Sequence, residues 1–107
     1  MDKLKNKIEN IKKDIKNLTA KFCDEKFSVA YYGAFDIDPK YLVYWICVQT
    51  DKVKHDLENN ESLENDLREL LDKNDYPIDS RKHVAIGFES QETVDRESNG
   101  NWWHHFK

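Results

Sequence analysis

Six apolar residues near the start of the chain recur at alternating intervals of four and three, which places them on one face of an α-helix. They are Leu4, Ile8, Ile11, Ile15, Leu18 and Phe22. Such a stripe has to be buried, either by a helix that lies across a sheet or by a short coiled coil between two copies of the chain. Because the stripe spans only about three heptads, we favour the helix on a sheet. The chain is accordingly expected to be a monomer or a homodimer.

Two stretches rich in β-branched and aromatic residues follow, and they predict a β-hairpin. In residues 27–35, aromatic residues and valine alternate with small residues, which is typical of a strand with one buried face. Residues 41–50 are the most hydrophobic stretch of the chain and predict a central strand buried on both faces. The intervening residues 36–40 have the aspartate and proline chemistry of a turn, so the two strands most simply pair antiparallel.

The second half of the chain predicts further helices and a third strand. Residues 51–74 show helical spacing that begins at the candidate caps Thr50 and Asp51, and a polar run interrupts that spacing near Asn60. Residues 83–90 predict the strand. A short helix capped by Ser90 is expected after it, and the Asn99-Gly100 pair closes it either as a left-handed helix stop or as a hairpin turn.

These elements predict one α+β domain that spans residues 1–107. The expected order is α-β-β-α-β, followed by the short C-terminal helix and an edge strand in NWWHHFK. The sheet is expected to have three or four mainly antiparallel strands, packed by two helices.

The charge distribution favours a protein partner over nucleic acid. The net charge is −4, yet residues 1–26 carry eight bases and five acids, whereas residues 51–75 carry nine acids and four bases. General nucleic-acid binding usually requires a basic patch that displaces counterions from phosphates. An acidic middle helix instead favours a basic protein partner.

Membrane insertion and secretion are not expected. The longest apolar run, YLVYWICV, is too short to span a bilayer, and the first ten residues lack the apolar segment of a secretory signal. We therefore expect a cytoplasmic protein. Its small size, its acidity and its lack of a catalytic motif suggest a bacterial origin.

The C-terminal stretch gathers residues that could carry chemistry. Glu89, Glu92, His104 and His105 combine carboxylate and imidazole groups, as a divalent-metal site or an acid/base pair requires. Adjacent histidines on a strand point to opposite faces, which weakens the metal interpretation. Cys47 lies among apolar neighbours and is expected to be an inert buried thiol. A small metal-dependent or acid/base enzyme is therefore the alternative, and no cofactor or metal is expected.

Aromatic and acidic residues supply the candidates for partner binding. Exposed tryptophan and tyrosine are enriched at interaction hot spots, and carboxylates complement a basic surface. The candidates are Trp102, Trp103, Tyr32, Tyr44, Glu61 and Glu64. The expected function is a small acidic binding protein without catalytic activity, such as an inhibitor, an immunity-like protein or a regulator.

Overall fold

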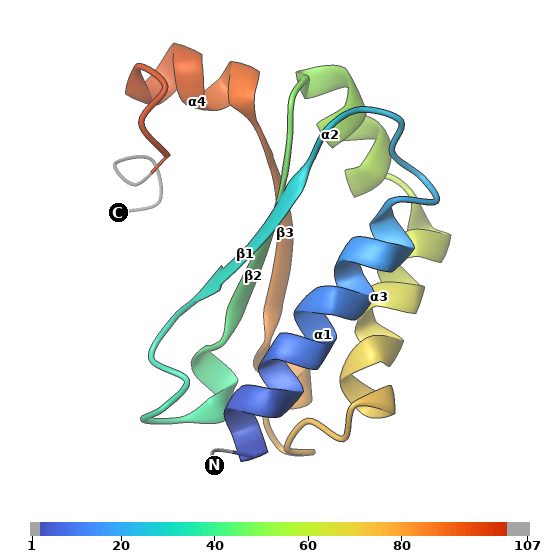
Figure 1. Cartoon of the computed structure of the whole chain (residues 1–107), viewed down its shortest axis with the longest axis vertical. Coiled ribbons are helices and arrows are strands. Elements are labelled where there is room, and N and C mark those ends of the chain that lie inside the picture. Colours follow the sequence, from blue (N-terminus) through green and yellow to red (C-terminus); the bar gives the residue numbers. More distant parts are fainter. Residues whose placement is uncertain (1–2, 103–107) are drawn as a thin grey trace.

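The computed structural model describes residues 3–102, which form an α+β fold (Figure 1). The elements are α1 (Lys3–Thr19), β1 (Ser28–Tyr32), the 3₁₀ turn η1 (Pro39–Tyr41), β2 (Val43–Val48), α2 (Asp51–Glu58), α3 (Glu61–Lys73), the 3₁₀ turn η2 (Arg81–His83), β3 (Ala85–Ser90) and α4 (Gln91–Ser98). Figure 1 shows α1 and α3 side by side against one face of the sheet, and α4 beyond the end of β3 on the opposite side. The predicted fold class is confirmed.

The sheet is mixed, so the prediction of a mainly antiparallel sheet is wrong. Its order is β1-β2-β3; β1 pairs antiparallel with β2, as predicted, but β2 pairs parallel with β3. The connection from β2 to β3 contains α2 and α3, which carry the chain back to the end of the sheet where β2 begins. A helical crossover of this kind joins parallel strands.

Three strands are found within residues 3–102. The predicted fourth strand in NWWHHFK lies almost wholly outside the described residues, since only Asn101 and Trp102 of that stretch are described. Within the same described part, no helix is long and apolar enough to cross a membrane.

The apolar stripe on α1 packs against the sheet and against α3. This is the arrangement that the short length of the stripe favoured over a coiled coil. Ile8, Ile11 and Ile15 are fully buried and join one hydrophobic core with residues of β2 and α3. Phe22 is an exception, because α1 ends at Thr19 and the ring of Phe22 is exposed. The stripe prediction is wrong at that sixth position.

Side-chain caps set the boundaries of the later helices. Thr50, Asn60 and Ser90 each accept a hydrogen bond from a backbone N–H in the first turn of α2, α3 and α4. The predicted break near Asn60 is therefore the junction of two helices. Asn99 ends α4 in the left-handed conformation, with φ of 52°, so the helix-stop interpretation of Asn99-Gly100 is confirmed.

Gly33 makes the connection between β1 and β2 possible. Its φ of +114° lies in a region that L side chains rarely adopt, and a Cβ built there would lie 2.0 Å from the backbone oxygen of Tyr41. The backbone of η1 therefore passes directly over Gly33 and closes the hairpin connection.

Candidate functional site

The two described carboxylates of the predicted Glu/His cluster have structural partners. Glu89 has a side chain only 11% exposed, which accepts hydrogen bonds from Lys54 Nζ at 2.8 Å and from the Ser90 N–H at 3.0 Å. Glu92 Oε1 accepts a hydrogen bond from the Asp51 N–H at 2.8 Å, at the start of α2. His104 and His105 lie outside the described residues. Within residues 3–102, no group of three His, Cys, Asp or Glu side chains could hold a metal ion.

Asp51 is the centre of a polar network that joins α2 to α4. Its carboxylate accepts hydrogen bonds from the hydroxyl of Ser90, from Thr93 Oγ1 at 2.7 Å and from Arg96 Nη1 at 3.0 Å. The hydrogen bonds from Ser90, Thr93 and Arg96 hold the pKa of Asp51 well below its usual range. The sequence indicated Asp51 only as part of a helix cap, because its partners lie about forty positions away.

The network arises because β2 and β3 run parallel and therefore end side by side. Each strand leads directly into a helix, so the positive N-terminal ends of α2 and α4 meet. Asp51 reaches the cap hydroxyl of α4, and Glu92 reaches the first N–H of α2. Glu25 adds a third carboxylate, bonded to the N–H and hydroxyl of Thr50 at 2.9 and 3.0 Å. The protein's own carboxylates therefore occupy a position where other folds bind anions.

Replacing Asp51 with asparagine is expected to lower the free energy of unfolding near neutral pH and to flatten its dependence on acid pH. Because the folded pKa of Asp51 is depressed, its contribution is complete above the unfolded pKa of about 3.9 and is lost as the pH falls from there through the folded pKa. Urea unfolding near neutral pH and at about pH 3 measures this difference. The exposed Asp56→Asn variant is the control; an equal response in both variants would contradict the assignment.

The face of the sheet away from α1 and α3 presents an aromatic surface, which we call the open face. It comprises, row by row across the three strands, Ser28, Cys47 and Glu89; Ala30, Trp45 and Gly87; and Tyr32, Val43 and Ala85. The indole of Trp45 lies over Gly87, since a Cβ at that glycine would be 2.8 Å from Trp45 Cζ3. Trp45 Nε1 donates a hydrogen bond to Tyr32 Oη at 2.8 Å, which fixes the ring.

Of the predicted binding aromatics, the structure places Tyr32 and Trp102 at least partly at the surface and Tyr44 in the core. Tyr32 is exposed, and Trp102 is half-buried, with its Nε1 donating to Gln91 Oε1 at 2.7 Å. Tyr44 is fully buried and donates to the backbone oxygen of Ile8 at 2.7 Å. Tyr44 therefore offers no surface to a partner, which corrects that prediction. Trp103 lies outside the described residues.

Burial also decides the chemistry of the thiol on the open face. Desolvation raises the pKa of Cys47 to about 11, so the group is protonated at neutral pH, as its apolar neighbours predict. Nucleophilic catalysis by Cys47 is not supported.

Two exposed isoleucines mark the opposite end of the molecule from α4. Ile37 is 80% exposed and Ile78 is 74% exposed. They belong to the connections that contain η1 and η2, which lie against each other (Figure 1). Tyr76 ties the two connections together by donating to the oxygen of Pro39 at 2.6 Å. Each isoleucine precedes an aspartate in a polar loop, and this repeated signal could have been found in the sequence.

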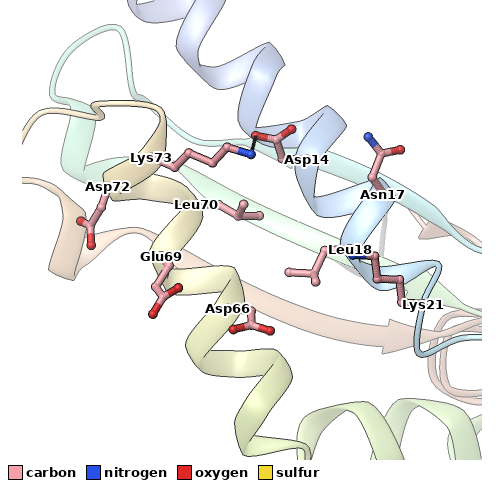
Figure 2. Close-up of a pocket in the computed structure, with 9 residues that line it drawn as sticks. All are labelled: Asp14, Asn17, Leu18, Lys21, Asp66, Glu69, Leu70, Asp72 and Lys73. Carbon is pink, nitrogen blue, oxygen red and sulfur yellow. Dashed lines mark ion pairs between the residues drawn. The ribbon is translucent and has the colours of Figure 1, made fainter.

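A groove of about 680 Å³ lies between α1 and α3 (Figure 2). It is lined by Asp14, Asn17, Leu18, Lys21, Asp66, Glu69, Leu70, Asp72 and Lys73. Figure 2 shows Leu18 and Leu70 directed toward each other between the helices, whereas Glu69 and Asp72 extend from the side of α3 away from α1. The groove therefore has an apolar floor and a charged rim, and we call it the α1–α3 groove.

Negative charge dominates the α3 side of this groove. Asp66 and Glu69 take part in no ion pair within the described residues, whereas Asp72 lies 3.2 Å from Arg81 Nη1. Arg68, the base between Asp66 and Glu69 in sequence, directs its guanidinium to the backbone oxygens of Arg81 and Val84 instead. Asp66 and Glu69 therefore form no ion pair with Arg68, and Lys73, the base at the end of α3, lies nearer to Asp14.

Charges of both signs meet across the groove where the end of α3 faces α1. Lys73 Nζ lies 4.0 Å from Asp14 Oδ2, which also accepts a hydrogen bond from Asn74 Nδ2 at 3.0 Å (Figure 2). Lys21 lies at the end of the groove just beyond α1. Asp66 and Glu69 are thus the acidic residues of the lining that form no ion pair within residues 3–102.

The two predicted acidic binding residues of α3 lie outside this groove. Glu61 and Glu64 are exposed in the first turn of α3. Glu64 lines a separate cleft beside β3, and Glu61 lines neither of these depressions. The sequence could not tell which carboxylates of α3 share a groove, because the groove also depends on residues of α1.

Comparison of the chain with protein-family models, with characterised protein sequences and with solved structures found no match.

Proposed function

We propose that this protein is a small acidic binding protein without catalytic activity, and that its α1–α3 groove holds a basic segment of a protein partner. The observation that carries the proposal is that Asp66 and Glu69 form no ion pair within the described residues and line one groove with the apolar side chains of Leu18 and Leu70. A groove of this make-up suits an amphipathic helix, whose apolar residues contact leucines while its lysines or arginines meet carboxylates.

An inhibitor or immunity-like role in the bacterial cytoplasm is the form of this function that we favour. Acidic surfaces steer basic targets and accelerate their association. Cys23 and Cys47 are free thiols, which suits a reducing compartment. The enzymatic alternative gains no support, because Glu89 and Glu92 are engaged by Lys54 and by the α2 N-terminus.

Charge reversal in the groove tests the proposal. The double variant Asp66→Lys, Glu69→Lys is expected to weaken binding of the native partner by about tenfold or more, because attraction becomes repulsion at two positions. The partner is first identified by affinity capture and mass spectrometry, and its affinity for each purified variant is then measured by calorimetry.

The matched control is Asp56→Lys, Glu61→Lys, which replaces two exposed acids on α2 and α3 outside the groove. Both double variants move the net charge from −4 to 0, since each substitution adds two units. The control is expected to retain most of the affinity. Equal losses in the two variants would show that total charge, and not the groove, governs binding.

A further inference from the structure

The outer side of β3 is a free strand edge. Within residues 3–102, β3 ends the sheet and pairs only with β2. Ala85 donates its N–H to the oxygen of Leu42, so Ala85 and Gly87 direct their backbone groups toward β2. Ile86 and Phe88, the residues that alternate with them, direct theirs outward. An outward row of this kind is a template for another strand.

Side chains of the protein already occupy both ends of this edge. Arg68 Nη1 donates to the backbone oxygen of Val84, one residue before β3 begins. Glu89 Oε1 accepts from the N–H of Ser90 at the other end, at 3.0 Å. The outward groups of Ile86 and Phe88 lie between these two contacts, which define a short docking segment.

A cleft of about 220 Å³ runs beside this segment on the helix side of the sheet. It is lined by Glu58, Glu64, Leu67, Arg68, Ile86, Gly87 and Phe88. Because Arg68 is held by backbone oxygens of the η2–β3 connection, the two glutamates supply the charge available to a ligand. Neither glutamate forms an ion pair within the described part of the chain.

We propose that an extended segment of a protein partner adds to the outer edge of β3, with lysine or arginine at alternate positions pointing into the Glu58/Glu64 cleft. Alternate side chains of an added strand point to opposite faces, so every second one enters the cleft. Main-chain hydrogen bonds to Ile86 and Phe88 would hold the segment, and the glutamates would select its charge.

The remaining side chains of the added strand would lie beside the open face. Its nearest positions there, Ala85 and Gly87, are small, and the Trp45 ring rests on Gly87. Valine, isoleucine or threonine in the partner would pack against the edge of that ring.

The same glutamates disfavour edge-to-edge pairing of two copies of this chain. A two-fold pairing through β3 would bring the Glu58 and Glu64 carboxylates of both copies together, and like charges repel across such an interface. The two glutamates therefore attract a basic strand and repel a second copy of this acidic chain. This binding mode is independent of the α1–α3 groove, which lies on the other side of α3.

The probe for this proposal is an acetylated and amidated octapeptide in which lysine alternates with valine between two terminal threonines. Binding is expected to slow hydrogen exchange at the Ile86 and Phe88 amides by about tenfold or more, because both become hydrogen-bonded donors. The Glu58→Lys, Glu64→Lys variant is expected to bind the peptide about tenfold more weakly and to prefer the analogue with glutamate in place of lysine. Fluorescence anisotropy gives the affinities, and NMR gives the exchange rates.

Two matched variants separate this edge from the other surfaces. Asp56→Lys, Glu61→Lys changes the net charge equally, and Asp66→Lys, Glu69→Lys removes the groove carboxylates; both are expected to retain the octapeptide. Unchanged exchange at Ile86 and Phe88, equal affinity for the lysine and glutamate peptides, or equal loss in the control variants would each overturn the proposal. If the Asp66→Lys, Glu69→Lys variant still binds the octapeptide but no longer binds the protein's native partner, the result supports both the groove proposal and the β3-edge proposal.

Discussion

Replacing Gly33 with alanine is expected to destabilise the protein by about 3 kcal/mol or more. The φ of +114° would be strained with any L side chain, and the new Cβ would lie 2.0 Å from the Tyr41 backbone oxygen. Relief requires the η1 backbone to move, yet η1 is tied down by the Tyr76 hydroxyl through Pro39. No small movement of the backbone in the native state would therefore relieve the strain.

Urea unfolding followed by far-UV circular dichroism measures this loss. Ala34→Ser, an exposed substitution in the same connection, is the control and is expected to change stability by less than about 0.5 kcal/mol. A Gly33→Ala variant as stable as the control would mean that the hairpin connection differs from the one described.

Replacing Ile11 with alanine is expected to cost about 2 to 5 kcal/mol, since the side chain is fully buried and its removal leaves a cavity between α1, the sheet and α3. The loss is expected to be independent of protein concentration, because the stripe on α1 is buried within one chain. A coiled-coil dimer would instead lose stability on dilution.

The matched control is Asn10→Ala, which changes the exposed neighbour of Ile11 on the same helix. It is expected to leave stability within about 0.5 kcal/mol of the native value. Thermal unfolding at several protein concentrations, with light scattering for mass, completes the comparison. A midpoint that rises with concentration would favour the dimer.

Local patterns in the sequence predicted those parts of the fold that local chemistry determines. The spacing of the isoleucines in α1 predicted a buried helix face. Thr50 and Ser90 marked the starts of helices, because a cap accepts a hydrogen bond from a backbone N–H only three positions away. The break near Asn60 followed from a polar run that interrupts the helical spacing. These predictions needed no knowledge of tertiary contacts.

The direction of β3 could not be inferred in the same way, although the helical crossover before it was a usable clue. Alternation in residues 83–90 identifies a buried face but is identical for parallel and antiparallel pairing. Tyr44 shows a related difficulty. Tyrosine is common in exposed binding surfaces, but it also fits a hydrophobic core in which its hydroxyl can donate to a backbone carbonyl oxygen. The oxygen of Ile8 that receives its hydrogen bond lies thirty-six positions away.

The candidate surfaces were predicted only in outline. Charge counting identified the acidic helical region, but Asp66 and Glu69 share a groove with Leu18 because α1 lies next to α3. The Asp51 network likewise depends on β2 and β3 ending together. Both sites join residues that are distant in sequence, and the Asp51 network depends on a parallel pairing where a mainly antiparallel sheet was predicted.

The crossover between β2 and β3 also has a consequence for the order of folding. The β1–β2 hairpin closes a short loop, whereas β3 can dock only after residues 49–84 have returned the chain across the sheet, a larger loss of entropy. The α1–α3 groove needs α3 in position, and the β3 edge needs that final docking. A nascent or partly folded chain would therefore present neither surface, and a partner that uses them would recognise only molecules that have finished folding.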